Sequence, residues 1–216
     1  MDLEQARFNM VEQQIRPWDV LDPTVLDLLF TVRREDFVPA AYRELAFADI
    51  EIPLGDGESM WSPKLEARVL QELDLAGGES VLEIGTGSGY LTALLASLAG
   101  PVTSVEIHDR LARDASARLR RAGFDQVDVR VGDGARGFGD ESYDAIVLTG
   151  STPVLHEAFF RQLKPGGRLF AIVGREPAMT AKLWRFDAPG STVETPLFET
   201  AVRPLVNAPA PARFEF

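Results

Sequence analysis

An apolar run that ends in three alternating glycines constrains this chain more than any other feature. The run covers residues 81–84, and the glycines that follow it are Gly85, Gly87 and Gly89. Glycine has no Cβ, so these positions can adopt positive φ and let a ligand approach the backbone closely. A helix over residues 90–99 would point its unpaired N–H groups toward the same place. The sequence therefore predicts a buried strand, a sharp turn and a helix, with a ligand held where they meet.

The spacing of the glycines argues against a dinucleotide as that ligand. The dinucleotide-binding fingerprint is G-x-G-x-x-G, whereas this loop reads G-x-G-x-G and continues with Tyr90. Glu83 stands one residue before the end of the strand, where its charge would repel a diphosphate and attract a cation. We therefore expect a cationic ligand, and a nicotinamide-dependent dehydrogenase is the least favoured hypothesis.

Carboxylates also follow the next two predicted strands. The strand over residues 102–105 is followed by Glu106, about 20 residues beyond the glycines, where an acidic side chain accepts hydrogen bonds from ribose hydroxyls. The strand over residues 127–131 runs into Gly132-Asp133-Gly134, where Asp133 can accept a hydrogen bond from an adenine amino group while the glycines let the ring lie flat. Ligands of open parallel sheets bind at the carboxyl ends of the strands, so these side chains are expected at one site.

Helices and strands alternate from residue 79 onward, which predicts an α/β fold with a mainly parallel sheet and right-handed crossovers. The predicted order is strand 81–84, helix 90–99, strand 102–106, helix 109–122, strand 127–131, strand 143–149, helix 153–163, a proline- and glycine-containing link 163–168, and strand 168–173. Two antiparallel edge strands are then expected over residues 180–186 and 197–205. Alanine and proline make residues 207–213 an extended tail.

The residues before the first strand predict helices with no strand partners. An amphipathic helix is expected from Leu3 to a point before Pro17, a second after the Asp22-Pro23 cap, a shorter one over residues 39–46, and a fourth from Ser62-Pro63 to Gly77-Gly78. They must pack over the sheet or roof the ligand site. We therefore divide the chain into an N-terminal helical cap and substrate-loop region (1–78), a cofactor-binding α/β core (79–206) and a tail (207–216).

Composition narrows the function further. The 216 residues suit one hydrophobic core with an appendage, and no window approaches the roughly 18 consecutive apolar residues of a membrane span. The acidic, polar first residues are unlike a signal peptide, so we expect a cytoplasmic protein that does not bind membranes. There is no cysteine and the two histidines lack ligand spacing, so no metal site is predicted. The formal net charge is −11 without a basic block, which argues against nucleic acid as a partner.

Several motifs together resemble one enzyme family over nearly the whole chain. They are residues 10–15 (MVEQQI), 32–39 (VRREDFVP), 52–57 (IPLGDG), 81–90 (VLEIGTGSGY), 131–134 (VGDG) and 163–168 (LKPGGR). The E-x-G-x-G-x-G pattern resembles motif I of class I S-adenosylmethionine-dependent methyltransferases, and the other stretches resemble protein-L-isoaspartate O-methyltransferase. That resemblance implies a Rossmann-like class I methyltransferase fold, S-adenosylmethionine as cofactor, and esterification of isoaspartyl carboxylates in damaged proteins or peptides. It carries no expectation about oligomeric state.

The resemblance assigns most of the cofactor site by position. The methionine part of the cofactor falls to the loop residues Glu83, Gly85, Thr86, Gly87, Ser88 and Gly89. Glu106 is assigned to the ribose, and Asp133 with Gly134 to the adenine. All the residues of the family pattern are present at these positions, so the cofactor site is expected to be intact.

The substrate loop departs from the family pattern. Where the family has Thr-Ile-Ser-Gln-Pro, this chain has Ser59-Met60-Trp61-Ser62-Pro63, so Trp61 stands in place of the active-site serine. Ser59, Trp61 and Ser62 are therefore the catalytic candidates, although Ser62 is equally explained as a helix cap. A carboxylate acceptor is ionised near pH 7 and needs no general base, so positioning is the main task. Trp61 can pack over the sulfonium or fill the peptide cleft. A methyltransferase with another acceptor, and a cofactor-binding module without turnover, remain the alternative hypotheses.

Overall fold

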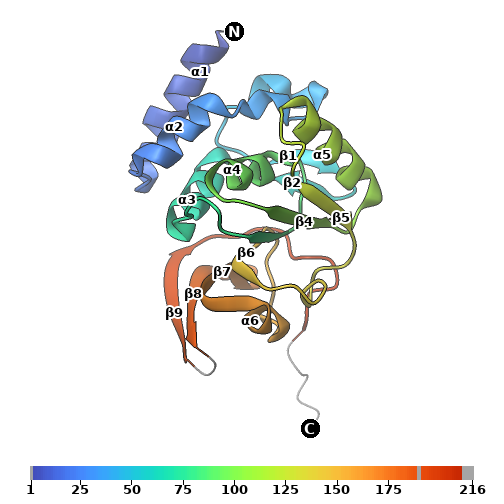
Figure 1. Ribbon diagram of the computed structural model, residues 1–216. Helices are drawn as coiled ribbons and strands as arrows, with labels where there is room; N and C mark the ends of the chain where they lie inside the picture. The colour runs from blue at the N-terminus through green and yellow to red at the C-terminus, as the bar shows by residue number, and fades with distance from the viewer. Residues whose placement is uncertain (1, 189–190, 211–216) are drawn as a thin grey trace.

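A seven-stranded sheet carries the fold of residues 2–188 and 191–210, the part of the chain that this computed structural model describes (Figure 1). The strands lie in the order β5-β4-β3-β6-β7-β8-β9. Their bounds are β3 Val81–Ile84, β4 Val102–Glu106, β5 Asp128–Val131, β6 Tyr143–Leu148, β7 Leu163–Arg175, β8 Ala178–Ala188 and β9 Ser191–Glu199. The pairs among β5, β4, β3, β6 and β7 are parallel, while β8 and β9 are antiparallel additions. The expectation of a mainly parallel sheet with an antiparallel pair at its edge is confirmed.

The central strands are apolar because both of their faces are covered. All four residues of β3 are buried, and successive side chains point to opposite faces. Val81 belongs to the cluster that includes the helices α2 to α5, whereas Leu82 belongs to a second cluster on the other face. Glu83 has the parity of Val81, so it points to the face on which α4 lies.

Two helices flank the glycine-containing loop at the end of β3. They are α4 (Tyr90–Leu98) directly after the loop and α5 (Asp109–Arg121) after β4. Leu111 and Leu119 of α5 belong to the same apolar cluster as Leu94 of α4. The two helices therefore lie on one face, as the alternating pattern requires, and both begin at the residue that the sequence predicts.

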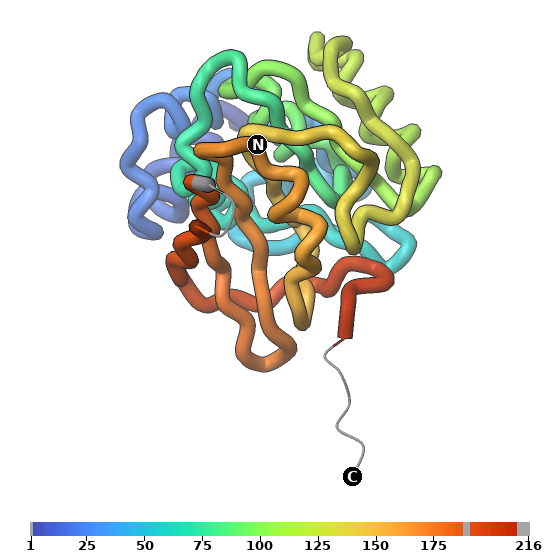
Figure 2. The backbone as a smooth tube through the Cα atoms, turned by 60° about the horizontal axis from the view of Figure 1, so that its bottom comes forward, coloured from blue at the N-terminus to red at the C-terminus, as the bar shows by residue number. Residues whose placement is uncertain are grey.

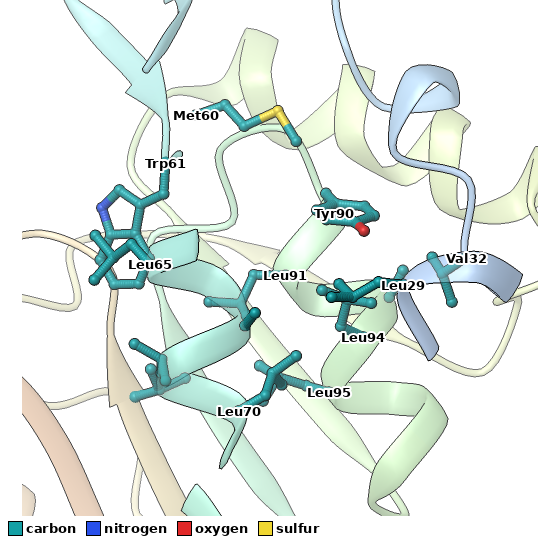
Figure 3. Close-up of a cluster of buried hydrophobic side chains, with 14 of the residues drawn as sticks. Leu29, Val32, Met60, Trp61, Leu65, Leu70, Tyr90, Leu91, Leu94 and Leu95 are labelled. Carbon is teal, nitrogen blue, oxygen red and sulfur yellow. The ribbon is translucent and has the colours of Figure 1, made fainter. Parts of the chain in front are cut away.

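The N-terminal helices form a layer outside α3 (Pro63–Leu73) and α4. They are α1 (Leu3–Met10) with a π-helical turn (Val11–Ile15) and a 3₁₀ turn (Arg16–Trp18), then α2 (Pro23–Thr31) and 3₁₀ turns over Arg34–Asp36 and Ala40–Leu45. Figure 3 shows Leu29 of α2 in one cluster with Leu94 and Leu70. The predicted cap of α2 is confirmed, because the Asp22 carboxylate accepts hydrogen bonds from the N–H groups of Thr24 and Val25.

A short hairpin, absent from the predicted elements, lies between the helical layer and the sheet. It consists of β1 (Ile52–Gly55) and β2 (Glu58–Met60), which pair in antiparallel fashion. Asp56 and Gly57 have φ of 55° and 82°, as a tight two-residue turn requires. The signal was the Asp-Gly pair after alternating Ile52 and Leu54. This hairpin lies at the cleft beside the strand ends. The N-terminal helices pack with α3 on one face of the sheet, which is the first of the two predicted alternatives.

Several predicted boundaries of the helices were wrong. The helix expected over residues 153–163 is only α6, Ala158–Arg161, and the link expected at residues 163–168 is already part of β7. Helix α3 ends at Leu73 because Asp74 adopts a left-handed conformation, before the glycines at 77 and 78. The short helix expected over residues 39–46 is 3₁₀ rather than α. No described helix is both long and apolar enough to cross a membrane.

The second edge strand was also misplaced. Strand β9 covers Ser191–Glu199, not residues 197–205, and the chain then leaves the sheet edge. Ser151 donates its N–H to Arg203 O and accepts from Leu205 N–H, both at 2.8 Å. Figure 2 shows this stretch, in red, running from the β9 side across the molecule. Of the predicted tail, residues 207–210 are described and Asn207 turns at φ 60°, while the rest lies outside the described residues.

Candidate active site

An open cleft lies at the carboxyl ends of the central strands. It is placed where the strand order changes direction, between β3, which continues to β4, and β6, which continues to β7. The cleft is lined by the hairpin region, the glycine loop, the ends of β4 and β5, the loop after β6 and the stretch after β9. These contributions include Glu51, Glu58, Ser59, Trp61, Gly85, Gly87, Glu106, Asp133, Gly134, Thr149, Gly150 and residues 203–206.

The three glycines adopt the positive φ that the sequence predicts. The values are 101°, 54° and 86° for Gly85, Gly87 and Gly89. A Cβ at Gly85 would collide with the Thr149 hydroxyl, and one at Gly89 would lie 3.3 Å from Ala115 Cβ of α5. The first and third glycines thus allow β6 and α5 to approach the loop. Gly85 and Gly87 line the cleft, whereas Gly89 does not appear among its lining residues in the described chain.

Glu83 is a fully buried carboxylate below the loop. Its Oε2 accepts hydrogen bonds from Thr92 Oγ1 at 2.5 Å and Ser104 Oγ at 2.6 Å. Oε1 is buried and has no hydrogen-bond partner within the described residues. Burial raises the pKa of this carboxyl to about 8, against the two hydroxyl donors, which lower it. Glu83 lines a small hollow that continues from the cleft past Trp61, so a cation there would meet an unpaired carboxylate oxygen.

Glu106 is held by backbone donors at the end of β4. Gly87 N–H donates to Oε2 at 2.9 Å, and His108 N–H donates to Oε1 at 3.0 Å. Each oxygen keeps a second lone pair, and the side chain lines the cleft. The glycine loop therefore fixes a carboxylate that can accept from two neighbouring hydroxyl groups of a ligand.

Asp133 and Gly134 line the cleft just after β5. Asp133 Oδ1 accepts from Ala135 N–H at 3.0 Å, and Oδ2 accepts from the Asn207 side chain at 2.9 Å. A Cβ at Gly134 would lie 2.8 Å from two atoms of Ile84, so this glycine lets the turn pack on β3. The contact with Asn207 was not foreseen, and it joins this turn to the stretch after β9.

Thr86 and Ser88 turn toward the protein rather than toward the large cleft. Thr86 Oγ1 lies 2.6 Å from Ser104 Oγ, and Ser88 Oγ accepts from Tyr90 N–H at 3.1 Å. Both residues are buried and line the small hollow beside Glu83. Their hydroxyls hold the loop in shape.

The three residues of the substrate loop have different positions. Ser59, on β2, and Trp61, just after it, line both the cleft and the small hollow. Trp61 is 6% exposed and lies beside Leu65 (Figure 3). Ser62 lines neither; it occupies the cap position of α3, and its hydroxyl makes no capping hydrogen bond in the described chain. The structure thus brings Ser59 and Trp61 to the cleft and leaves Ser62 outside it.

A buried ion pair anchors the backbone of this loop. Arg34 and Glu66 are 1% and 2% exposed and are hydrogen-bonded to each other. Arg34 Nη2 also donates to Trp61 O at 2.5 Å, and its Nε donates to Ala46 O at 2.8 Å. Burial raises the pKa of the Glu66 carboxyl to about 7 despite the guanidinium beside it. Sequence analysis found Arg34 only as part of a motif, because nothing in its spacing indicates its partners.

The loop after β6 contributes backbone rather than free hydroxyl groups. Thr149 Oγ1 donates to the carbonyls of Ile84 and Gly85, and Ser151 Oγ donates to Val202 O at 3.0 Å. Thr149 and Gly150 line the cleft. This loop therefore ties the glycine loop to the stretch after β9.

Residues 203–206 are the part of the cleft that sequence analysis missed. Arg203, Pro204, Leu205 and Val206 line it, although they were assigned to an edge strand and its end. Their alternating apolar pattern is the same in a strand and in a segment that crosses a sheet edge. Glu51, just before the hairpin, and Glu58, the first residue of β2, also line the cleft and were also missed.

The charges of the site distinguish between cofactor classes. Four acidic residues line the cleft, which suits hydroxyl, amino and cationic groups and opposes a diphosphate. No three Asp, Glu or His side chains of the described residues lie together as a metal site. A Rossmann-like sheet with a glycine loop between carboxylates at successive strand ends defines a class I S-adenosylmethionine-dependent methyltransferase.

The sequence model of the protein-L-isoaspartate(D-aspartate) O-methyltransferase family matches residues 5–209. The chain belongs to this family. It is 44% identical to protein-L-isoaspartate O-methyltransferase 1 of Rhodopseudomonas palustris strain HaA2 over 171 residues, which cover 79% of this chain and 70% of that protein. It is 40% identical to the protein-L-isoaspartate O-methyltransferase of Methanoculleus marisnigri over 205 residues, 94% and 92% of the two chains. A solved protein-L-isoaspartate O-methyltransferase structure has a TM-score of 0.77 at 26% identity and covers 92% of this chain and 65% of its own.

Proposed function

We propose that the protein transfers a methyl group from S-adenosylmethionine to the free carboxylate of isoaspartyl residues in damaged proteins. The observation that carries this proposal is the family match over residues 5–209, together with 40% identity to a relative across 94% of the chain. The proposal includes a role in repair in the cytoplasm, because esterification makes the carboxylate a better electrophile for ring closure and renewed hydrolysis. It also keeps the division into a cap and substrate-loop region (1–78), a cofactor core (79–206) and a tail.

The residues of the cleft fit S-adenosylmethionine. The buried, unpartnered Oε1 of Glu83 suits the cationic methionine end, and Glu106 suits the ribose hydroxyls. The turn at Asp133 and Gly134 suits the adenine, with Asn207 as a neighbour of the carboxylate. When bound, this cofactor supplies a methyl group on a positively charged sulfur. The protein must hold the acceptor in line with it and keep water out.

The acceptor side needs positioning more than proton transfer. A carboxylate has a reference pKa of about 4, so it is ionised near neutral pH and no general base is required. Arg34 fixes the carbonyl of Trp61, and this sets the indole and Ser59 at the wall of the cleft. The Ser59 hydroxyl can donate a hydrogen bond to the acceptor at that wall. Trp61 supplies an apolar surface that excludes water.

Methylation of a defined peptide tests the proposal. Protein saturated with labelled S-adenosylmethionine is incubated with an isoaspartyl peptide and with the same peptide containing normal aspartate. We expect base-labile methyl incorporation into the first peptide and none into the second. Equal labelling of both peptides, or labelling of neither, would exclude isoaspartyl specificity.

Trp61→Ser tests whether the departure from the family pattern changes the acceptor. If the parent methylates isoaspartyl peptide, the tryptophan is compatible with the reaction. The methylation rate of the variant should then lie within about tenfold of the parent's rate, because the loop positions the acceptor and transfers no proton. Activity in the variant alone would instead support another acceptor for the parent protein. Phe in place of Trp61 is the matched control for bulk, since it keeps an apolar ring and removes the indole N–H.

A further inference from the structure

The charges around the cleft create a problem for an anionic acceptor. Glu51, Glu58, Glu106 and Asp133 line it, and among its described lining residues Arg203 is the single lysine or arginine. The protein also carries a formal net charge of −11. A carboxylate that enters such a cleft is repelled unless a cation receives it. Arg203 is placed to be that cation.

The backbone around Arg203 is fixed while its side chain is exposed. Ser151 N–H donates to Arg203 O at 2.8 Å, and two residues later Leu205 N–H donates to Ser151 O at 2.8 Å. Val202, just before it, is buried and accepts from the Ser151 hydroxyl. The guanidinium makes no ion pair or hydrogen bond within residues 2–188 and 191–210. Arg203 is therefore a cation on a rigid support with its donors available.

Arg203 also stands where two hollows meet. A groove runs beside the cleft and is lined by the turn between β7 and β8, the loop after β6 and the stretch after β9. Glu51, Arg203 and Pro204 line both the groove and the cleft. Burial raises the pKa of the Glu51 carboxyl and the positive charge of Arg203 opposes it, so the charges of these two side chains interact across the junction. A chain lying in the groove would pass the guanidinium before it reaches the cofactor cleft.

We propose that Arg203 is the specificity-determining residue that binds the acceptor carboxylate, with the peptide that carries it lying in the adjoining groove. This inference rests on the proposed function. A guanidinium presents paired N–H donors that match both oxygens of a carboxylate. The pairing orients the acceptor without taking a proton from it. Arg203 acts on substrate choice and not on cofactor binding.

A pair of peptides that differ only in the acceptor group, carboxylate or amide, tests this inference. Binding is measured by calorimetry to protein saturated with S-adenosylhomocysteine, using one peptide with isoaspartate and one with isoasparagine, which replaces the carboxylate by a neutral amide. Loss of a charged hydrogen bond corresponds to roughly 10- to 100-fold in affinity. We expect the parent to prefer isoaspartate by that factor. Arg203→Gln should remove the preference, and Arg203→Lys should restore part of it.

Arg185→Gln is the control, because Arg185 is an exposed arginine of β8 that lines neither hollow in the described chain. It changes the net charge equally and should keep the preference. In the methylation assay, Arg203→Gln should raise KM for the peptide while the affinity for S-adenosylhomocysteine stays unchanged. One outcome would overturn this inference alone: the parent methylates the isoaspartyl peptide, and Arg203→Gln prefers isoaspartate over isoasparagine as strongly as the parent does. Parent protein that neither binds nor methylates the peptide overturns the proposed function and this inference with it.

Discussion

Glu83→Gln is expected to stabilise the protein at neutral and alkaline pH. The carboxyl is fully buried, and burial raises its pKa to about 8 from an ordinary value of 4.5. Between these values the folded protein keeps the proton, whereas the unfolded chain has released it. Unfolding therefore becomes easier as pH rises through this window. A glutamine is neutral at every pH and has nearly the same shape, so its amide oxygen can accept from Thr92 and Ser104 as Oε2 does.

The size of the effect follows from the separation of the two pKa values. At about 1.36 kcal/mol per pH unit, the parent loses at most about 3 kcal/mol of stability between pH 4.5 and pH 7 through Glu83. The loss reaches about 5 kcal/mol by pH 8 if the whole shift is realised. Near pH 4.5 both side chains are neutral, so parent and variant should be nearly equally stable. The advantage of the variant should then grow steadily with pH.

Urea unfolding of both proteins at several pH values from 4.5 to 8.5 measures the effect. Subtracting one free energy of unfolding from the other removes the contributions of all other titrating groups. Glu79→Gln is the control, because the Arg168 side chain lowers the pKa of the Glu79 carboxyl, so the difference from the parent should have the opposite sign. Parallel pH profiles for the parent and Glu83→Gln would refute the argument that Glu83 is held neutral by burial.

The same substitution should weaken cofactor binding. A cation beside Oε1 favours the ionised carboxylate, so binding should release a proton when the pH lies below about 8. Calorimetry in buffers of different ionisation heat counts that proton. In Glu83→Gln the released proton should vanish and the affinity should fall by roughly tenfold or more, as expected for loss of a charged hydrogen bond. Unchanged affinity and proton count would show that the cationic group lies elsewhere.

Three further changes test how the site is supported, each by urea unfolding at pH 7. Gly85→Ala should lower the free energy of unfolding by about 2 to 4 kcal/mol, because φ is 101° and the added Cβ would collide with the Thr149 hydroxyl. Gly77→Ala is the control: a Cβ there has open space in the described structure, so no measurable loss is expected. Arg34→Met should lower the free energy of unfolding by about 3 to 5 kcal/mol, because it breaks the buried pair with Glu66 and removes the donors to Trp61 O and Ala46 O; a loss below about 1 kcal/mol would contradict this. Asp22→Ala should cost about 1 kcal/mol through the lost cap of α2. Ser62→Ala should cost clearly less, since its hydroxyl caps no N–H in the described chain, and it should leave methyl transfer unchanged.

The elements with strong local signals could be predicted closely from the sequence. Strand β3 has the predicted bounds, and α4 and α5 begin at the predicted residues, because buried apolar runs and glycine turns determine them locally. The second edge strand failed for the opposite reason. Residues 197–205 alternate like a strand, but β9 already pairs with β8 from Ser191, opposite Ala188, and this pairing ends at Glu199. The Asp56-Gly57 turn did carry a local signal for a hairpin.

The site divides in a similar way. Part of the site could be found from spacing in the sequence alone. The three glycines and Glu83 lie in one contiguous stretch, and Glu106 lies at the end of the next strand. Arg203 comes into the cleft through backbone bonds to Ser151, which lies 52 positions earlier in the chain. Arg34 is buried, pairs with Glu66 and donates a hydrogen bond to the carbonyl of Trp61. Such contacts depend on how distant segments pack, and single residues give no sign of them.

Residues 203–206 form one wall of the cleft, so during synthesis the sheet can begin to fold before the cleft is complete. A ribosome completes the glycine loop about 120 residues before it adds this wall, so an emerging chain can form much of its sheet while the pocket still lacks one side. The Ser151 and Asn207 contacts can close only after that late segment has left the exit tunnel. Closure of the binding pocket therefore follows the synthesis of residues 203–207, whereas the strands and helices around the glycine loop precede them in the chain.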